Sequence, residues 1–294
     1  MGDVKDKVVL ITGGARGIGA ETAKDLAAKG AYVVITDVEA DALGAVAADI
    51  GDRALAAVAD VTDLSAMEKA VAAGVERFGG VDVVVANAGI ASYGSVLNVD
   101  PATFRRVIDI NVNGVFHTVR AALPSVIERK GYIMVVSSLA AFAPAPGLAA
   151  YNASKAGAEH FANALRLEVA HHGVDVGSAH MSWIDTPLVQ DAKKDLSAFN
   201  QLLESLPYPL SKTTSVDKCV AALVKGIENR DRRVYVPGWV GLVAKGRGIV
   251  NSRVGERDTR KVTPRLLPLM DEEVAQLGRS TSARNVAPMA HAED

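Results

Sequence analysis

The sequence predicts an α/β fold in which a doubly wound parallel sheet of about seven strands carries helices on both faces. Two patterns support this prediction. Short apolar runs rich in β-branched residues recur along the chain, and longer alanine-rich stretches with helical periodicity separate them. The expected strands are KVVLIT, AYVVIT, RALAAV, VDVVVA, YIMVVS, VDVGSA and RRVYVP. Strands that are apolar throughout are typical of a parallel sheet buried on both sides.

This alternation continues to about residue 236 without a linker or an internal repeat, so we expect residues 1–236 to form one domain. A chain of 294 residues that is 49% hydrophobic and 22% charged can bury a sizeable core. Beyond Pro237 the pattern changes, and residues 237–294 are expected to form a C-terminal extension.

The composition excludes several classes of function. A formal net charge of -2 provides no field for nucleic acid, and the six histidines lack metal-ligand spacing, so we expect neither nucleic acid nor a metal. The single cysteine, Cys219, cannot form an internal disulfide, and the first residues lack signal-peptide features, so we expect a reducing, cytoplasmic setting. Residues 131–154 carry no formal charge, but their serines and prolines favour a strand and loop over a transmembrane segment.

A glycine-rich loop, TGGARGIG, follows the first strand and opens the first helix. Glycines in this position let the backbone approach a pyrophosphate, which the free N–H groups of the helix terminus can bind. The alternative is a tight strand-to-helix turn without a ligand. Because the loop lies between a strand and an alanine-rich helix, we expect it to bind a dinucleotide.

The second strand ends at Asp37, about 20 residues beyond the loop, where a carboxylate can reach the ribose hydroxyls of an adenosine. This carboxylate would repel a 2′-phosphate, so we expect NAD as the cofactor. Arg16, in the loop, could instead pair with such a phosphate. We expect repulsion by Asp37 to outweigh attraction by one exposed arginine.

Tyr151 and Lys155 are one helical turn apart in an alanine-rich helix, so both side chains lie on one face. An ammonium group beside a phenol is expected to lower the phenol's pKa, which suits proton exchange with an alcohol or a ketone. Ser138, at the end of the preceding strand, could donate a hydrogen bond to a carbonyl. The alternative interpretation of the Tyr–Lys pair is a solvated helix surface.

Taken together, TGGARGIG at 12–19, Asp60, NAG at 87–89, Asn111, Ser138 and YNASK at 151–155 make residues 5–236 resemble the short-chain dehydrogenase/reductase family, which has a Rossmann-type fold. The resemblance implies that Tyr151 is the catalytic acid or base. Lys155 would lower its pKa and hold the nicotinamide ribose, Ser138 would orient the substrate oxygen, and Asn111 would hold a water in a proton relay. The alternative for Asn111 is a buried side chain bonded to backbone in a kinked helix.

The resemblance also implies the cofactor contacts. The loop would hold the pyrophosphate, Asp60 and Val61 would meet the adenine, and Thr186 would contact the nicotinamide carboxamide. The expected set is Gly13, Arg16, Gly17, Ile18, Gly19, Asp37, Asp60, Val61, Asn87, Ala88, Gly89, Tyr151, Lys155, Ile184 and Thr186. Asn87 could equally cap a strand end. Met181 and Ser182 replace the family's usual Pro-Gly, so we expect a different loop shape there.

Residues 187–212 lie where the family has a substrate lid. Apolar side chains in this segment predict an apolar pocket that includes Leu188 and Ser138; they are Leu188, Phe199, Leu202, Leu203 and Tyr208. Trp183 is expected either to line this pocket or to lie in the core. We therefore expect an NAD(H)-dependent enzyme that interconverts an apolar, steroid-like or lipid-like secondary alcohol and its ketone. The alternatives are an NADPH-dependent carbonyl reductase and a non-catalytic dinucleotide-binding protein.

The extension mixes apolar and basic residues, a pattern that could lie on a membrane surface, extend the lid or contact a subunit. We favour a lid or subunit contact, because glycines interrupt any long amphipathic helix. The last residues, 280–294, are expected to be weakly ordered. The family resemblance suggests a dimer or a homotetramer.

Overall fold

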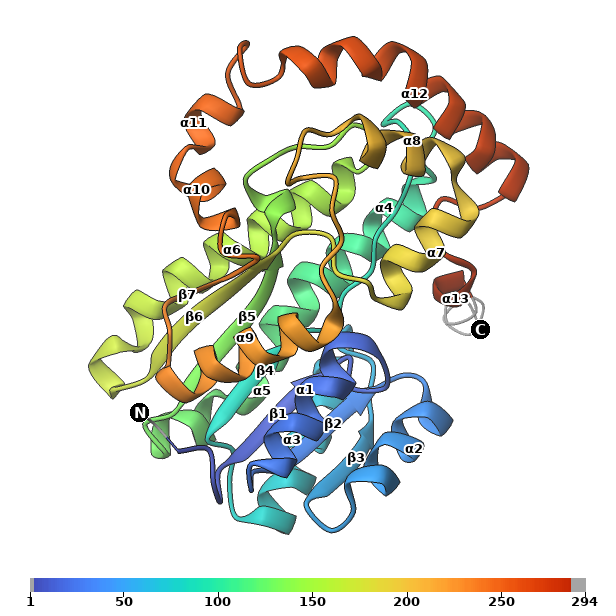
Figure 1. The fold of residues 1–294 in the computed structure, drawn as a ribbon. Helices are drawn as coiled ribbons and strands as arrows, with labels where there is room; N and C mark the ends of the chain where they lie inside the picture. The colour runs from blue at the N-terminus through green and yellow to red at the C-terminus, as the bar shows by residue number, and fades with distance from the viewer. Residues whose placement is uncertain (1–2, 287–294) are drawn as a thin grey trace.

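The structure, a computed structural model, describes residues 3–286 and has a seven-stranded parallel sheet at its centre (Figure 1). The strands are β1 (Val8–Thr12), β2 (Tyr32–Asp37), β3 (Ala54–Val58), β4 (Val83–Ala86), β5 (Tyr132–Ser138), β6 (Asp175–Met181) and β7 (Arg233–Val236). Their order is β3-β2-β1-β4-β5-β6-β7, so the order reverses at β1. This confirms the predicted doubly wound fold, which leaves a crevice at the carboxyl ends of the strands beside the reversal.

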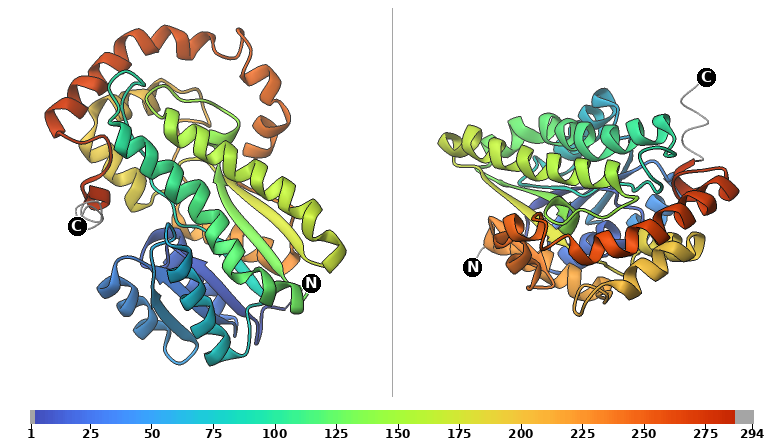
Figure 2. Two further views of the ribbon diagram at one scale, coloured as in Figure 1. Left: turned by 180° about the vertical axis from the view of Figure 1, so that it is seen from behind. Right: turned by 90° about the horizontal axis from the view of Figure 1, so that it is seen from above.

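Both faces of the sheet are covered because successive residues of each strand point to opposite sides. In β1, Val9 and Ile11 belong to one hydrophobic core, and Val8 and Leu10 belong to the other. Helices α1 (Gly17–Ala28), α2 (Ala40–Ile50) and α9 (Val216–Asn229) cover the first core. Helices α3 (Leu64–Phe78), α5 (Gly114–Glu128) and α6 (Ala149–Val169) cover the second. Figure 2 shows these layers on either side of the sheet.

Local signals begin and end several of these helices. The Asp63 carboxylate accepts hydrogen bonds from two backbone N–H groups at the start of α3, and Asp100 does the same for α4 (Pro101–Ile108). A proline occupies the first turn of α4, where its missing N–H costs nothing. Gly79 ends α3 in the left-handed conformation with φ 83°. Such caps set the residues at which these helices begin and end. They therefore also set the lengths of the loops that join the helices to the strands.

Two helices, α7 (Pro187–Asp195) and α8 (Ser197–Ser205), follow β6 and form most of the segment expected to be a lid. The extension comprises α10 (Val240–Lys245), α11 (Arg247–Val250), α12 (Arg257–Leu277) and α13 (Ala283–Val286). It arches over the carboxyl end of the sheet and ends beside α7 (Figures 1 and 2). Met270 and Val274 of α12 are buried in one cluster with Phe199 and Leu203 of α8. The lid and the extension therefore share an apolar core.

The expectation of weak order at the end of the chain differs from the structure at residues 280–282, which are buried. Ser280 O accepts a hydrogen bond from Tyr93 N (2.7 Å), and Thr281 forms an antiparallel bridge with Ser92. The polar composition of residues 280–294 suggested disorder. In the structure, residues 280–282 form hydrogen bonds with the backbone of a distant segment instead. Residues 287–294 lie outside the described part of the chain.

Within residues 3–286, no helix is long and apolar enough to cross a membrane. The same part of the chain has no group of three or more His, Cys, Asp or Glu side chains that could hold a metal ion.

Candidate functional site

A cavity of about 300 Å³ lies at the carboxyl ends of the strands, beside the reversal of strand order. Its walls come from the glycine-rich loop, the ends of β2, β4 and β5, the start of α7 and the extension. Most of the site residues expected from the sequence line it. They are Gly13, Arg16, Gly17, Ile18, Asp37, Asp60, Val61, Asn87, Ala88, Gly89, Ser138, Tyr151, Lys155, Ile184, Thr186 and Leu188. Gly19, Asn111 and Trp183 do not border this cavity.

The glycine loop is shaped by close contacts that side chains would block. Gly13 has φ +67°, and a Cβ there would lie 2.9 Å from Asn87 Nδ2. A Cβ at Gly19 would overlap Gly13 O, so Gly19 is needed where helix α1 meets the loop. Asn87 Nδ2 donates to Thr12 O (2.9 Å) and Gly13 O (3.3 Å), which ties the end of β4 to the loop. A dinucleotide pyrophosphate fits this glycine-lined cradle at the start of α1.

Acidic groups surround the end of β2. Asp37 Oδ2 accepts from Ala15 N (3.1 Å) and Oδ1 from Glu39 N (3.2 Å), so Asp37 also braces the glycine loop. Arg16 donates to Glu39 Oε2 through Nε (2.8 Å) and Nη2 (2.6 Å). The hydrogen bond to Glu39 raises the pKa of Arg16. No pattern in the sequence indicated Glu39, which holds two nitrogens of the guanidinium that could otherwise meet a 2′-phosphate.

Asp60 follows β3, the strand next to β2, and is braced by its own neighbours. Its Oδ1 accepts from Thr62 N and Thr62 Oγ1, both at 2.8 Å, and its Oδ2 lies 3.4 Å from Arg106 Nη2. Arg106 also borders the cavity and was not expected from the sequence. An arginine in a helix carries no local signal of this role, because the helix α4 brings it to Asp60 from 46 residues away.

The strand β5 and the helix α6 bring the catalytic candidates together. Ser138 ends β5, where its Oγ accepts from Ala140 N (3.1 Å), and Tyr151 and Lys155 lie one turn apart on α6. Lys155 Nζ lies 5.7 Å from the centre of the Tyr151 ring and donates to Val136 O (3.0 Å). Ser137, one residue before Ser138, bonds through Oγ to the backbone oxygen of Lys155 (2.8 Å). Ser137 is buried like the rest of β5 before it, whereas Ser138 is partly exposed.

Burial has the largest effect on the pKa values of this pair. Burial raises the pKa of the Tyr151 phenol, and a hydrogen bond with Ser138 only partly opposes this effect. Burial also lowers the pKa of Lys155 to about 8, because the ammonium has lost most of its water. The spacing of Tyr151 and Lys155 in the sequence indicates the charge beside the phenol, but it does not show that both groups are desolvated.

Asn111 lies in a short π-helical segment, Asp109–Asn113, that joins α4 to α5. Its Oδ1 accepts from Ile90 N (2.9 Å), and its Nδ2 donates to Ile90 O and Ser154 Oγ, both at 2.9 Å. The side chain is fully buried and bonded within the protein, so it does not face the cavity. A Cβ at Gly89 would lie 3.2 Å from both Asn111 Oδ1 and Lys155 Nζ, so this glycine lets the two groups approach.

A smaller apolar cavity of about 80 Å³ adjoins the first at Ser138 and Tyr151. Trp183, Leu188 and Phe199 line it, and the Trp183 and Phe199 rings meet edge to face at 5.3 Å. Leu202 and Leu203 are buried away from this cavity. Tyr208 is 81% exposed, contrary to expectation, because it lies in the turn after α8. The expected apolar pocket is therefore narrower than the lid sequence suggested.

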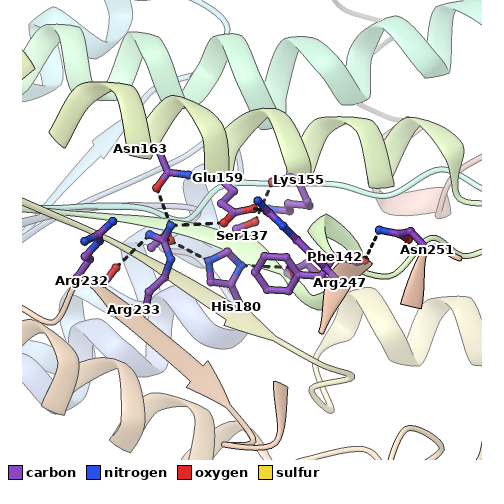
Figure 3. A network of polar contacts seen from close by, with 12 residues as sticks. Ser137, Phe142, Lys155, Glu159, Asn163, His180, Arg232, Arg233, Arg247 and Asn251 are labelled. Carbon is purple, nitrogen blue, oxygen red and sulfur yellow. Dashed lines mark hydrogen bonds and ion pairs between the residues drawn. The ribbon is translucent and has the colours of Figure 1, made fainter. Parts of the chain in front are cut away.

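A network of polar contacts joins α6, β6 and β7 next to Lys155 (Figure 3). Arg233 donates to Asn163 Oδ1 (2.6 Å) and Ser178 Oγ (2.9 Å), and it lies 3.5 Å from Glu159 Oε1. Ser178 Oγ lies 2.8 Å from His180 Nε2. Burial lowers the pKa of His180 to about 3, so the ring is neutral at neutral pH.

This network also reaches the extension (Figure 3). Glu159 lies one turn beyond Lys155 on α6, and Arg247 of α11 lies 3.9 Å from its Oε2. Asn251 Nδ2 donates to Phe142 O (3.2 Å), in the loop between β5 and α6. The loop and helix that carry the catalytic candidates are thus attached to the extension, which no motif in the sequence indicated.

The crevice at the reversal of strand order, with its glycine cradle, defines a nucleotide-binding α/β protein. A model of the short chain dehydrogenase family matches residues 7–197. The chain is 34% identical over 256 residues to (-)-trans-carveol dehydrogenase of Rhodococcus erythropolis, covering 76% of this chain and 92% of that one. It is 38% identical over 200 residues to trans-4-hydroxycyclohexanecarboxylate dehydrogenase of Sinomonas cyclohexanicum, covering 65% and 77%.

Solved structures give the same result. The 3-ketoacyl-(acyl-carrier-protein) reductase from Brucella melitensis, complexed with NADH, matches with a TM-score of 0.72 and 31% identity. The match covers 79% of this chain and 97% of that one. The chain belongs to the short-chain dehydrogenase/reductase family and is an oxidoreductase of that family.

Proposed function

We propose that this protein is an NAD(H)-dependent dehydrogenase that interconverts a small apolar secondary alcohol and its ketone. One observation carries the proposal: Ser138 and Tyr151 lie where the large cleft meets the apolar cavity, and Lys155 lies beside them. A dinucleotide in the cleft and an alcohol in the cavity would meet at these side chains.

When bound, the nicotinamide supplies or accepts the hydride. Tyr151 would take the hydroxyl proton of the alcohol during oxidation and return it to the carbonyl oxygen during reduction. Ser138 Oγ would donate a hydrogen bond to the same oxygen, and the Lys155 ammonium would stabilise the phenolate.

The charges at the end of β2 support NAD over NADP. Asp37 and Glu39 both border the cavity, and a 2′-phosphate would meet two carboxylates there. Arg16 could offset this repulsion, but Glu39 holds two of its three guanidinium nitrogens. Its release would favour the alternative function, an NADPH-dependent carbonyl reductase.

The apolar cavity supports a small substrate. At about 80 Å³ it lies below the range of drug-sized ligand pockets, so it favours a small cyclic alcohol over the steroid-like substrate that the sequence suggested. Two relatives are dehydrogenases named for alcohols of that kind, (-)-trans-carveol and trans-4-hydroxycyclohexanecarboxylate.

The test is a fluorescence titration with NADH and NADPH, followed by a turnover screen of small cyclic secondary alcohols with NAD and of their ketones with NADH. We expect NADH to bind more tightly than NADPH and at least one alcohol to be oxidised. Tighter binding of NADPH would favour the carbonyl reductase. Tight NADH binding without turnover of any alcohol or ketone would favour a non-catalytic dinucleotide-binding protein.

A further inference from the structure

The end of the extension crosses the mouth of the cleft. We call residues 279–286 the return segment, because the chain here turns back from α12 towards the cleft. On one side, Thr281 Oγ1 donates to Ala91 O (2.7 Å), and Ser280 Oγ accepts from Asp100 N (3.2 Å). With the bridge between Thr281 and Ser92, these bonds anchor the segment to the loop that follows β4.

On its other side the return segment is bonded to the lid helix α7. Arg279 Nη2 lies 2.8 Å from Asp195 Oδ2, and Arg284 Nε lies 3.4 Å from Asp191 Oδ2. Figure 1 shows α13 beside α7. The segment therefore connects the two walls of the cleft, and Ser282, Arg284 and Asn285 line the same cavity as the glycine loop.

The position of Arg284 relative to the glycine loop follows from α7. Pro187 begins this helix next to Gly17, where a Cβ would lie 3.5 Å from Pro187 Cδ. Asp191 is four residues later, about 6 Å along the helix axis and on the same face. The guanidinium at Asp191 thus borders the cavity about one helical turn from the loop that would hold a pyrophosphate.

The charges along the cleft distinguish Arg284 from the other described cations there. Arg16 and Arg106 lie among the acids at the ends of β2 and β3, and Lys155 lies beside Tyr151. Arg284 borders the cavity beside α7, the helix whose first residue packs against the glycine loop. The side chain is 37% exposed and contacts Asp191 through Nε, which leaves its two terminal nitrogens to bind an anion. Without it, the Asp191 carboxylate would repel a diphosphate in the cleft.

We propose that Arg284 binds the cofactor's diphosphate from the lid side, so that the return segment forms part of the dinucleotide site. This inference rests on the proposed function, in which the cleft takes NAD(H). The backbone N–H groups of the glycine loop would hold one side of the diphosphate, and the Arg284 guanidinium would hold the other. Asp191 orients the guanidinium while the cleft is empty and competes with the diphosphate for it.

The test compares Arg284→Gln with Asp191→Asn, because the two variants break the same ion pair. Arg284→Gln should weaken NADH binding by about tenfold to a hundredfold, the range expected for lost hydrogen bonds to a charged group. Asp191→Asn should make NADH binding tighter, because it removes a carboxylate that competes with the diphosphate for Arg284. The dissociation constants are measured by NADH fluorescence at low salt. The exposed Arg253→Gln controls for the loss of one positive charge and should bind NADH like the wild type.

Adenosine and ADP-ribose locate the effect, since only ADP-ribose has the diphosphate. Arg284→Gln should weaken ADP-ribose binding by the same factor as NADH binding and leave adenosine binding unchanged. Equal weakening by Arg284→Gln and Asp191→Asn would mean that the ion pair only holds the lid, which overturns the proposal. Unchanged NADH affinity in Arg284→Gln, or a change in the alcohol KM alone, would overturn it as well. If the wild type binds no NADH, the proposed function itself fails.

Discussion

Replacing Lys155 with methionine should stabilise the protein while abolishing its activity. The Lys155 side chain is buried, and its Nζ donates to a single backbone oxygen, that of Val136. Burial lowers the pKa of this lysine from 10.5 to about 8. That change corresponds to about 3 kcal/mol of unfolding free energy, which the ammonium costs the folded protein at neutral pH. A hydrogen bond to a charged group is worth about 1.5 kcal/mol or more, so Lys155→Met should gain about 1–1.5 kcal/mol at neutral pH.

The pH dependence separates this cause from better packing. The folded pKa lies below the unfolded one, so between pH 8 and 10.5 the unfolded chain binds more protons at Lys155. The wild type therefore recovers stability as the pH rises through this window, and Lys155→Met does not. The advantage of Lys155→Met should be largest at pH 7 and should disappear towards pH 10.5. Contributions from other groups are shared by the two proteins and cancel in the difference.

Urea denaturation of both proteins at pH 7 and at pH 9.5 measures this difference. Lys225→Met, on the exposed side of α9, controls for the loss of a surface charge and should change stability little at either pH. A destabilised Lys155→Met at pH 7, or a gain that is the same at both pH values, would show that desolvation of the ammonium is not the dominant effect.

Three further changes test other parts of the site. Tyr151→Phe should lower kcat by about a hundredfold to ten-thousandfold while the Kd for NADH stays within about twofold, as measured by turnover and fluorescence. Gly19→Ala should abolish detectable NADH binding and destabilise the fold by about 2 kcal/mol or more, because its Cβ would overlap Gly13 O. Glu39→Gln should release Arg16 and shift the ratio of the NADPH and NADH dissociation constants by about tenfold towards NADPH.

Each of these has a contrasting outcome. Gly44 lies on the exposed face of α2, and a Cβ there would have nothing within 4 Å. Gly44→Ala should therefore stabilise the protein by about 0.5–1 kcal/mol. A loss of stability in this variant would contradict the reasoning that attributes the effect of Gly19→Ala to its contact with Gly13 O. Retained turnover in Tyr151→Phe would remove the tyrosine from the proposed chemistry. An unchanged cofactor ratio in Glu39→Gln would show that Asp37 alone sets the preference.

The sequence predicted the fold well because its signals are local. Apolar runs identify buried strands wherever they occur, and the alternation of strands with helices leaves few arrangements other than a doubly wound sheet. The loop glycines, Ser138, Tyr151 and Lys155 are recognisable for a similar reason. Each follows the carboxyl end of a parallel strand, and these ends meet at one edge of the sheet.

The sequence alone did not reveal how the site is charged. Whether Lys155 lowers the pKa of Tyr151 depends on how much water each side chain loses, and burial is set by all the segments that surround them. The pairing of Arg16 with Glu39 was missed for the same kind of reason. Asp37 matched a known spacing, but nothing in the sequence showed which acid the arginine would contact.

The sequence by itself determined the sheet, the glycine cradle and the side chains available for chemistry, because each follows from local patterns of apolar residues, glycines and neighbouring positions. Only the tertiary structure decided that the extension closes over the cleft. The hydrogen bond that anchors the extension joins Thr281 to Ala91, which are 190 residues apart. Arg284 of the extension borders the cavity and contacts Asp191 of α7. Contacts at such separations depend on how the entire chain packs, and neither partner carries a local signal of the other.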